Sequence, residues 1–115
     1  MTGQTQWRRV VAETSTKADG RNVWAPLVVR RLLGLENGSK VVFYLDDDGD
    51  VCIGREAEGL PLGETHVYSG GWISLVQPAR RMLGVRTGDR IAWVVKRVGE
   101  GYRVCLEKKE LRLVA

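Results

Sequence analysis

Histidine, cysteine and long apolar runs are scarce in this chain of 115 residues, and each scarcity excludes a class of protein. His66 is the only histidine, so no histidine pair exists to ligate a metal. Cys52 and Cys105 are too few for a disulfide scaffold, and no CxxC spacing suggests zinc. No apolar run approaches the roughly 18 residues that cross a bilayer. We therefore expect no metal, no cofactor and no membrane-spanning helix.

Two further absences concern targeting and catalysis. The first six residues are polar and lead into Trp7, Arg8 and Arg9 with no apolar segment behind them, so we expect no signal peptide and a cytoplasmic protein. No nucleophile, base and orienting group form a catalytic set, so we expect a protein that is not an enzyme.

The charges present are mostly arginine and are unevenly distributed. Thirteen arginines and five lysines make up the 18 cations, and 14 acidic residues leave a net charge of +4. Residues 1–57 hold eight cations and eight anions, whereas residues 58–115 hold ten and six, so the second half carries the whole excess. Guanidinium groups suit phosphate and carboxylate, which makes a polyanionic partner worth considering.

The chain contains an internal repeat. The segment Arg30-Arg31-Leu32-Leu33-Gly34-Leu35 returns fifty residues later as Arg80-Arg81-Met82-Leu83-Gly84-Val85, and Gly38 and Phe43 answer Gly88 and Trp93 at the same offset. Beyond a hairpin the offset grows to fifty-three, where 51–53 answers 104–106. The repeats cover about 7–56 and 64–107, with a connector at 57–63 and a tail or extra strand at 108–115.

Each repeat predicts the same elements. The first predicts strands at 8–14 and 22–25, a helix at 27–33 that Pro26 opens and Gly34 closes, and a hairpin of 40–45 and 51–54. The second predicts strands at 65–68 and 72–75, a helix at 77–83, and a hairpin of 90–96 and 102–106. One repeat is too small to close its own sheet. We therefore expect a single mostly-β domain, a small closed barrel with an internal pseudo-two-fold axis and two short helices.

The stretch from Gly20-Arg21 through Ala25-Pro26 to Leu33-Gly34-Leu35 resembles the AbrB/SpoVT/MazE DNA-binding domain. The second repeat matches from Gly70 to Leu106, without the arginine. The resemblance implies a swapped-hairpin barrel that homodimers of the family complete, here as a fused pseudo-dimer. The DxxxR signature of the MraZ branch is missing, because Lys17 stands four residues before Arg21. Related barrels of the RIFT and double-psi types often bind other ligands, so a function other than DNA binding remains an alternative.

The resemblance also implies which residues contact DNA. Family members present arginines from the loop before the second strand, from the helix and from the first strand; the matching positions are Arg8 or Arg9, Arg21, Arg30, Arg31, Arg80 and Arg81. Such side chains bind phosphate oxygens and supply affinity without reading sequence. Alternatively, the helix arginines form the solvated side of amphipathic helices, and Arg21 caps a turn or pairs with Asp19.

Other conspicuous residues predict structural roles. Alternation places Trp24 and Trp72 opposite the core face, either stacking on a partner or partly buried, while Phe43 and Trp93 belong to the core. Asp46 to Asp50 predicts an acidic hairpin tip that repels DNA, since its spacing does not fit a calcium loop. Cys52 and Cys105 are expected in paired strands as small apolar residues.

The expected function is double-stranded DNA binding, as a transcriptional regulator or nucleoid-associated factor with possible self-association. The alternatives are a protein-binding or ligand-binding barrel, either antitoxin-like or like the N-terminal domains of archaeal AAA ATPases. A toxin partner is not favoured, because only about nine residues follow the last predicted strand.

Overall fold

The computed structural model describes residues 5–17 and 21–109, which form eight strands and two helices. The same order of elements, two strands, a helix and two strands, occurs twice along the chain. The elements are β1 (Thr5–Ser15), β2 (Asn22–Trp24), α1 (Leu27–Leu33), β3 (Lys40–Leu45), β4 (Val51–Gly54), β5 (Leu60–Tyr68), β6 (Trp72–Ser74), α2 (Gln77–Leu83), β7 (Arg90–Val98) and β8 (Gly101–Lys109).

Both helices begin and end where the sequence predicts. Pro26 precedes α1, and Pro78 lies in the first turn of α2, where a missing backbone N–H costs nothing. Gly34 and Gly84 follow the last turns with φ of 66° and 67°, the left-handed region that glycine adopts without a Cβ penalty. Local chemistry therefore accounts for both seven-residue helices.

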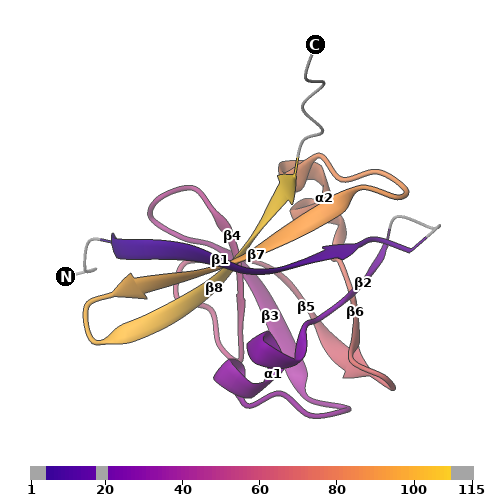
Figure 1. The fold of residues 1–115 in the computed structure, drawn as a ribbon, viewed down its shortest axis with the longest axis horizontal. Coiled ribbons are helices and arrows are strands. Elements are labelled where there is room, and N and C mark those ends of the chain that lie inside the picture. Colours follow the sequence, from indigo (N-terminus) through magenta and orange to yellow (C-terminus); the bar gives the residue numbers. More distant parts are fainter. Residues whose placement is uncertain (1–4, 18–20, 110–115) are drawn as a thin grey trace.

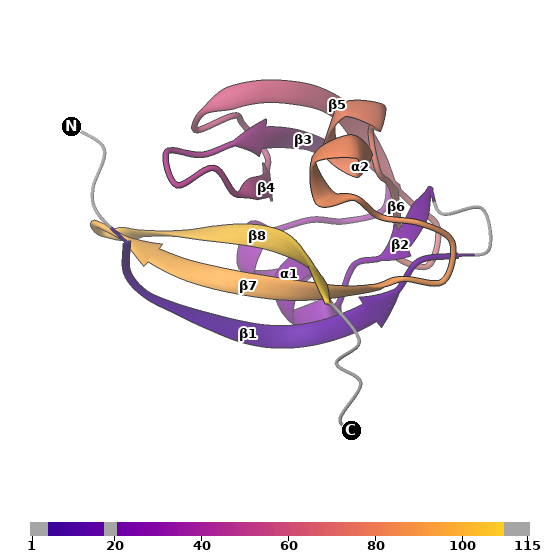
Figure 2. The ribbon, with the colours of Figure 1, turned by 90° about the horizontal axis from the view of Figure 1, so that it is seen from above.

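The eight strands labelled in Figure 1 join one curled antiparallel sheet, and their order is β1-β7-β8-β4-β3-β5-β6-β2. Beyond the two hairpins, strands of one half pair mostly with strands of the other: β1 with β7, β5 with β3, β4 with β8, and β2 with β6. The sheet wraps around the core as a half-barrel (Figure 2). Its two edge strands approach each other at a single bridge between Thr16 and Val23.

The core lies inside this curled sheet and is closed by one residue from each helix, Val29 and Ala79. Phe43 and Trp93, predicted as core, are fully buried. The Trp93 indole N–H donates to the Thr14 hydroxyl at 2.8 Å, which satisfies its one polar group inside the barrel. The core prediction from strand alternation is thus confirmed at these positions.

The predicted connector at 57–63 is partly wrong, because β5 begins at Leu60 rather than at residue 65. Leu60 and Pro61 pair with Leu45 and Tyr44 of β3. At that point β5 has a partner on one side only, since β6 pairs with its last two residues. A proline without a backbone N–H is tolerated there. Gly59, Pro61 and Gly63 therefore mark a bulged edge segment and not a loop.

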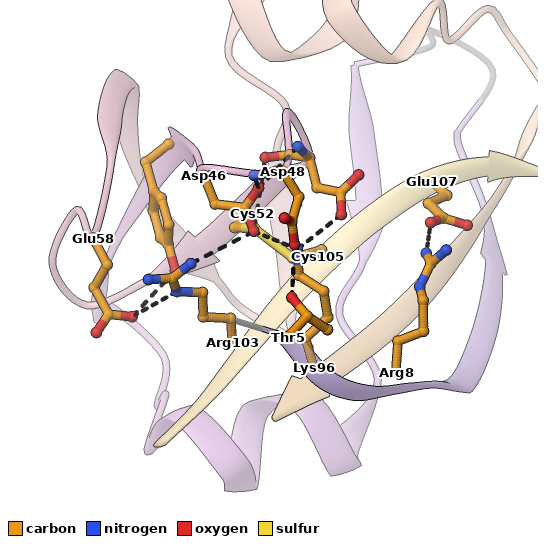
Figure 3. Close-up of a disulfide and its surroundings, with 12 residues drawn as sticks. Thr5, Arg8, Asp46, Asp48, Cys52, Glu58, Lys96, Arg103, Cys105 and Glu107 are labelled. Atoms are coloured by element: carbon orange, nitrogen blue, oxygen red, sulfur yellow. Dashed lines mark hydrogen bonds and ion pairs between the residues drawn. A yellow bond between two sulfur atoms is a disulfide. The ribbon is translucent and has the colours of Figure 1, made fainter. Parts of the chain in front are cut away.

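The two cysteines lie opposite each other in paired strands, as predicted, but they form a disulfide and not two separate apolar thiols (Figure 3). Cys52 of β4 and Cys105 of β8 are both fully buried. The repeat places equivalent residues of the two halves next to each other where β4 meets β8, so two cysteines suffice for a covalent link between the halves. Counting cysteines could not reveal this, because the link depends on strand register.

Candidate functional site

The arginines of α1 differ in exposure. Arg31 is exposed, whereas Arg30 is half-buried and its Nε donates to the Ala25 carbonyl at 2.9 Å. The Arg30 guanidinium also lies 5.5 Å from the ring centroid of Trp24. It rests against Gly71 in the β5–β6 turn, where a Cβ atom would stand 2.8 Å from the guanidinium carbon. Arg30 is therefore held by the protein itself, and only Arg31 points freely outward.

The arginines of α2 are arranged differently. Arg81 is exposed, and Arg80 is half-buried like its counterpart Arg30. The Nε of Arg80 is buried, yet it has no hydrogen-bond partner in the described part of the chain. Both side chains line a hollow of about 390 Å³ at the end of α2, together with Arg86, Gln77, Gly84 and Val85. The second half thus gathers three arginines around one concavity.

Arg21 lies beside α2 and not beside the helix of its own repeat. Its carbonyl accepts a hydrogen bond from the N–H of Leu75, just before α2, at 2.6 Å. In the equivalent bond the N–H of Ala25, before α1, donates to the Gly71 carbonyl at 2.9 Å. The Arg21 side chain is exposed, and its predicted partner Asp19 lies outside the described residues. The cross-half pairing therefore places the Arg21 backbone just before the start of α2.

Arg8 and Arg9 do not join the helix arginines. Arg8 forms an ion pair with Glu107 of β8 (Figure 3). The Arg9 guanidinium lies 5.8 Å from the ring centroid of Trp7. Both arginines lie in the first half of β1, eight and seven residues before Thr16, whose hydroxyl donates to the Arg86 carbonyl at 3.2 Å near α2. Eight extended residues span on the order of 25 Å. These two arginines therefore belong to a separate part of the surface.

Ion pairing separates the cations into two groups. Among residues 5–17 and 21–109, the helix arginines and Arg86 form no ion pair. The cations that do pair with carboxylates are on strands: Arg8, Lys40, Arg90, Lys96, Arg103, Lys108 and Lys109. Arg9, Lys17, Arg55 and Arg97 also form no ion pair in that part of the chain, so the helix arginines and Arg86 make up one part of its uncompensated positive charge.

The hairpin between β3 and β4 has the acidic tip that the sequence predicts, with Asp47 and Asp48 exposed, but its other aspartates are bound to the second half of the chain. Asp46 is buried, and its carboxylate accepts a bond from Lys96 of β7, whose ammonium also reaches Asp48 at 3.0 Å and Asp50 at 2.8 Å (Figure 3). Burial by itself lowers the pKa of Lys96, but the bonds to these three carboxylates outweigh burial and raise the pKa to about 12. One ammonium from the other half thus compensates one of the four negative charges of residues 46–50.

A second polar group adjoins this cluster. The Tyr44 hydroxyl donates to Glu58 at 3.3 Å, and Arg103 lies within 4.0 Å of the same carboxylate. Burial raises the pKa of the Tyr44 hydroxyl above its usual value. Tyr44 and Glu58 line a larger hollow of about 670 Å³, which also includes Leu32, Lys40 and Tyr102. This hollow mixes apolar and charged groups of both signs.

The tryptophans of the β2–β6 pair lie on the outer face, as alternation predicts. Trp24 pairs with Trp72 across the two strands, and its ring is 37% exposed. The Trp24 indole N–H donates to the Gly70 carbonyl at 2.9 Å, and Lys17 lies 4.1 Å from the Trp72 ring centroid. Both indoles are therefore partly covered by their own protein and are flanked by cations.

Sequence reasoning missed three residues of this surface and its surroundings: Gln77, Arg86 and Lys96. A signal existed for two of them. Gln77 and Arg86 occupy the repeat positions of Leu27 and Glu36. The second half therefore has a polar residue where the first has an apolar one, and a basic residue where the first has an acidic one. Lys96 gave no such signal, because only the pairing of β7 brings it to the β3–β4 hairpin.

Comparisons with known proteins identify no relative: the chain matches no family model, no curated protein and no solved structure. Among the described residues, neither helix has the length and hydropathy needed to cross a membrane.

Proposed function

We propose that this protein binds double-stranded DNA through arginines at the ends of its two helices. The observation that carries the proposal is the segregation of charge: the helix arginines are without acidic partners, whereas the cations on strands are mostly paired. Paired cations have their charge already compensated, so they add little to the attraction of a polyanion. The unpaired group remains available to phosphate oxygens.

We further propose that the fold is a swapped-hairpin barrel of the AbrB type with a pseudo-two-fold axis. The test is to replace each strand of the first half by its counterpart in the second half, β1 by β5 and so on to β4 by β8, and the reverse. The β1–β7 pair then becomes the observed β5–β3 pair, and the β3–β4 hairpin becomes the observed β7–β8 hairpin. The β4–β8 and β2–β6 pairs map onto themselves. This exchange supports a fused pseudo-dimer, in which each half completes the sheet of the other.

In this mechanism, Arg31 and Arg81 contact phosphates directly, since both are exposed. Arg21 adds a contact beside α2, and Arg30 acts mainly by orienting Trp24 and the β5–β6 turn. Arg8 and Arg9 lie outside the contact surface. Guanidinium forks bind phosphate oxygens in a bidentate manner, which fixes the orientation of the protein on the duplex. The role that follows is DNA organisation or transcriptional regulation.

The test is fluorescence anisotropy of a labelled random-sequence duplex across a range of salt concentrations. Each phosphate contact contributes about −0.9 to the slope of log K against log salt. Replacing Arg31 and Arg81 together by alanine should weaken binding and reduce the slope by about 2. Arg8→Ala is the matched control, because Arg8 is paired with Glu107, and it should leave the slope nearly unchanged. Absence of binding at low salt would refute the proposal.

One observation favours a second candidate, a barrel that binds a protein or small ligand. The 670 Å³ hollow contains exposed Leu32 and Tyr102 beside Lys40 and Glu56. Such a mixture of apolar and charged groups is typical of ligand pockets and not of DNA surfaces. This candidate predicts no affinity for the duplex and no effect of the arginine variants, so the same titration separates the two functions.

A further inference from the structure

We propose that the hollow beside α2 is a phosphate-binding site and that only the second half of the chain carries one. The inference deepens the proposed DNA binding and rests on it for one point, namely that the bound phosphate belongs to a nucleic acid. The chemical feature recognised is a tetrahedral phosphate group, whether free or esterified in a nucleic-acid backbone.

Three guanidinium groups converge on this hollow. Arg80, Arg81 and Arg86 line it, with the Gln77 side chain beside them. Arginine presents its N–H donors in a planar fork that matches two phosphate oxygens, and several forks around one phosphate satisfy its remaining acceptors. A volume of about 390 Å³ admits a phosphate together with part of the group that it esterifies.

The Nε of Arg80 lacks a hydrogen-bond partner within the described residues, which favours a partner from outside the protein. Buried donors in folded proteins are nearly always hydrogen-bonded, and leaving one unsatisfied costs free energy. This Nε is the one buried side-chain polar atom without a partner in the described residues. Arg80 lines the hollow, so a rotation of its side chain on binding would bring this Nε to an oxyanion held there.

The first half provides an internal comparison. The equivalent Nε of Arg30 is satisfied by the Ala25 carbonyl, and its guanidinium occupies the space above Gly71. The residue equivalent to Gly71 is Arg21. A side chain at the Gly71 position would stand 2.8 Å from the guanidinium carbon, so Arg80 lacks the space that Arg30 uses. The exchange of one glycine for arginine leaves the α2 arginine unsatisfied.

The remaining differences between the two halves also favour phosphate binding at α2 over α1. Gln77 and Arg86 line the α2 hollow, whereas Leu27 and Glu36 occupy the equivalent positions after β2 and α1. A carboxylate at residue 36 would repel a phosphate, and a leucine at residue 27 offers it no donor. The two helices are therefore equivalent in backbone but not in chemistry.

Asp89, three residues after Arg86, does not cancel the positive charge of the hollow. The Asp89 carboxylate accepts a hydrogen bond from the backbone N–H of Arg86 at 2.7 Å, and this bond is the largest cause that lowers the pKa of Asp89. The same carboxylate lies 3.5 Å from the Lys108 ammonium. One carboxylate is thus compensated by one ammonium, and no acidic side chain lines the hollow. The three guanidinium charges remain for the ligand.

The first experiment uses inorganic phosphate as the probe, titrated at constant ionic strength against chloride. The readout is the NMR signal of the arginine Nε–H groups. The Arg80 signal should shift saturably while the Arg30 signal does not. In the double variant Arg81→Gln/Arg86→Gln the apparent affinity should fall at least tenfold. The control Arg8→Gln, at an exposed arginine that is paired with Glu107 outside the contact surface, should behave like the parent protein. Equal shifts of Arg30 and Arg80, or an unaffected double variant, would overturn the inference.

A second double variant, Arg81→Lys/Arg86→Lys, separates geometry from charge. It keeps both positive charges but removes the planar forks, so it should lose most of the preference for phosphate over chloride. Unchanged preference would mean a diffuse electrostatic surface and not a built site. All substituted residues are exposed, so the folded state is expected to survive, and a thermal melt of each variant verifies this.

The DNA titration distinguishes failure of this inference from failure of the proposed function. If the duplex binds but the Arg81→Gln/Arg86→Gln variant loses no more affinity than Arg31→Gln, the phosphate site is wrong and DNA binding stands. If phosphate shifts Arg80 but no duplex binds, the site stands and the phosphate belongs to a smaller ligand. If both hold, the double variant should reduce the salt slope by about 2 and Arg31→Gln by at most about 1.

Discussion

Lys96 of β7 lies against the buried carboxylate of Asp46, so that a strand of the second half binds a hairpin of the first. Both side chains are almost fully enclosed, with exposures of 1% and 0%. Two further carboxylates and the guanidinium of Arg103 complete the cluster next to the disulfide (Figure 3). The base of the acidic hairpin is therefore bound to the structural core through Lys96, while Asp47 and Asp48 at its tip remain exposed.

Replacing Lys96 by methionine should lower the free energy of unfolding by about 3–5 kcal/mol, because Asp46 would stay buried without its main partner. Chemical denaturation in urea at neutral pH measures the change. Adding Asp46→Asn to the variant should recover part of the loss. The control is Lys109→Met, which removes an exposed ion pair with Glu13 and should cost at most about 1 kcal/mol. Equal effects of the two lysine variants would contradict the account of the cluster.

Stability should decline at alkaline pH. Burial raises the pKa of Tyr44 above its unfolded value of 10.0, and bonds to aspartates raise that of Lys96 from 10.5 to about 12. The folded state therefore binds more protons than the unfolded state above pH 10, so this stability is complete below pH 10 and is lost as the pH rises. Urea denaturation between pH 8 and 11.5 tests this. Tyr44→Phe should reduce the slope by up to about 1.4 kcal/mol per pH unit, whereas the exposed control Tyr68→Phe should not.

Reducing the Cys52–Cys105 disulfide should destabilise the protein by about 4 kcal/mol, because the link closes a loop of 53 residues in the unfolded chain. Guanidinium denaturation with and without a reductant measures the difference. The variant Cys52→Ala/Cys105→Ala should match the reduced protein and be insensitive to reductant. Identical midpoints for oxidised and reduced protein would show that the bond does not constrain the chain in solution.

Gly71→Ala should be more destabilising than Gly70→Ala, although both glycines have positive φ, of 87° and 82°. Each substitution incurs a backbone strain of about 1–2 kcal/mol. Only the Cβ at residue 71 collides with Arg30, which should lose its bond to Ala25 at a further cost of about 1 kcal/mol. Thermal melts give the difference, and the fluorescence of Trp24 should change in Gly71→Ala alone. Equal costs with unchanged fluorescence would mean that Arg30 does not depend on the glycine.

The repeat and its local signals account for much of the fold. Helix bounds at residues 27–33 and 77–83 agree between sequence and structure, because the proline and glycine at their ends act through local backbone geometry. The start of β5 was misjudged, because Pro61 is tolerated only where β5 has an open side, and neighbouring strands decide that.

Individual arginines of the candidate site could be predicted from the sequence, but which of them lie together in the structure could not. Arg31 and Arg81 are exposed at the helix ends, as an amphipathic helix requires, but Arg8 is paired with Glu107 and Arg30 is anchored by Ala25. Arg86 entered the site without having been singled out. Which arginines are compensated depends on carboxylates far away in sequence, so no local pattern reveals it.

The amino-acid sequence alone determined the order of elements, the repeat and the core-facing residues, because these follow from contacts within a few residues and from the alternation of apolar side chains. Only the tertiary structure decided which partners cross between the halves. The Lys96–Asp46 pair, the Cys52–Cys105 link and the placement of Arg21 beside α2 each join residues about fifty positions apart. Such contacts depend on strand register, which the closing of two half-sheets around one core imposes.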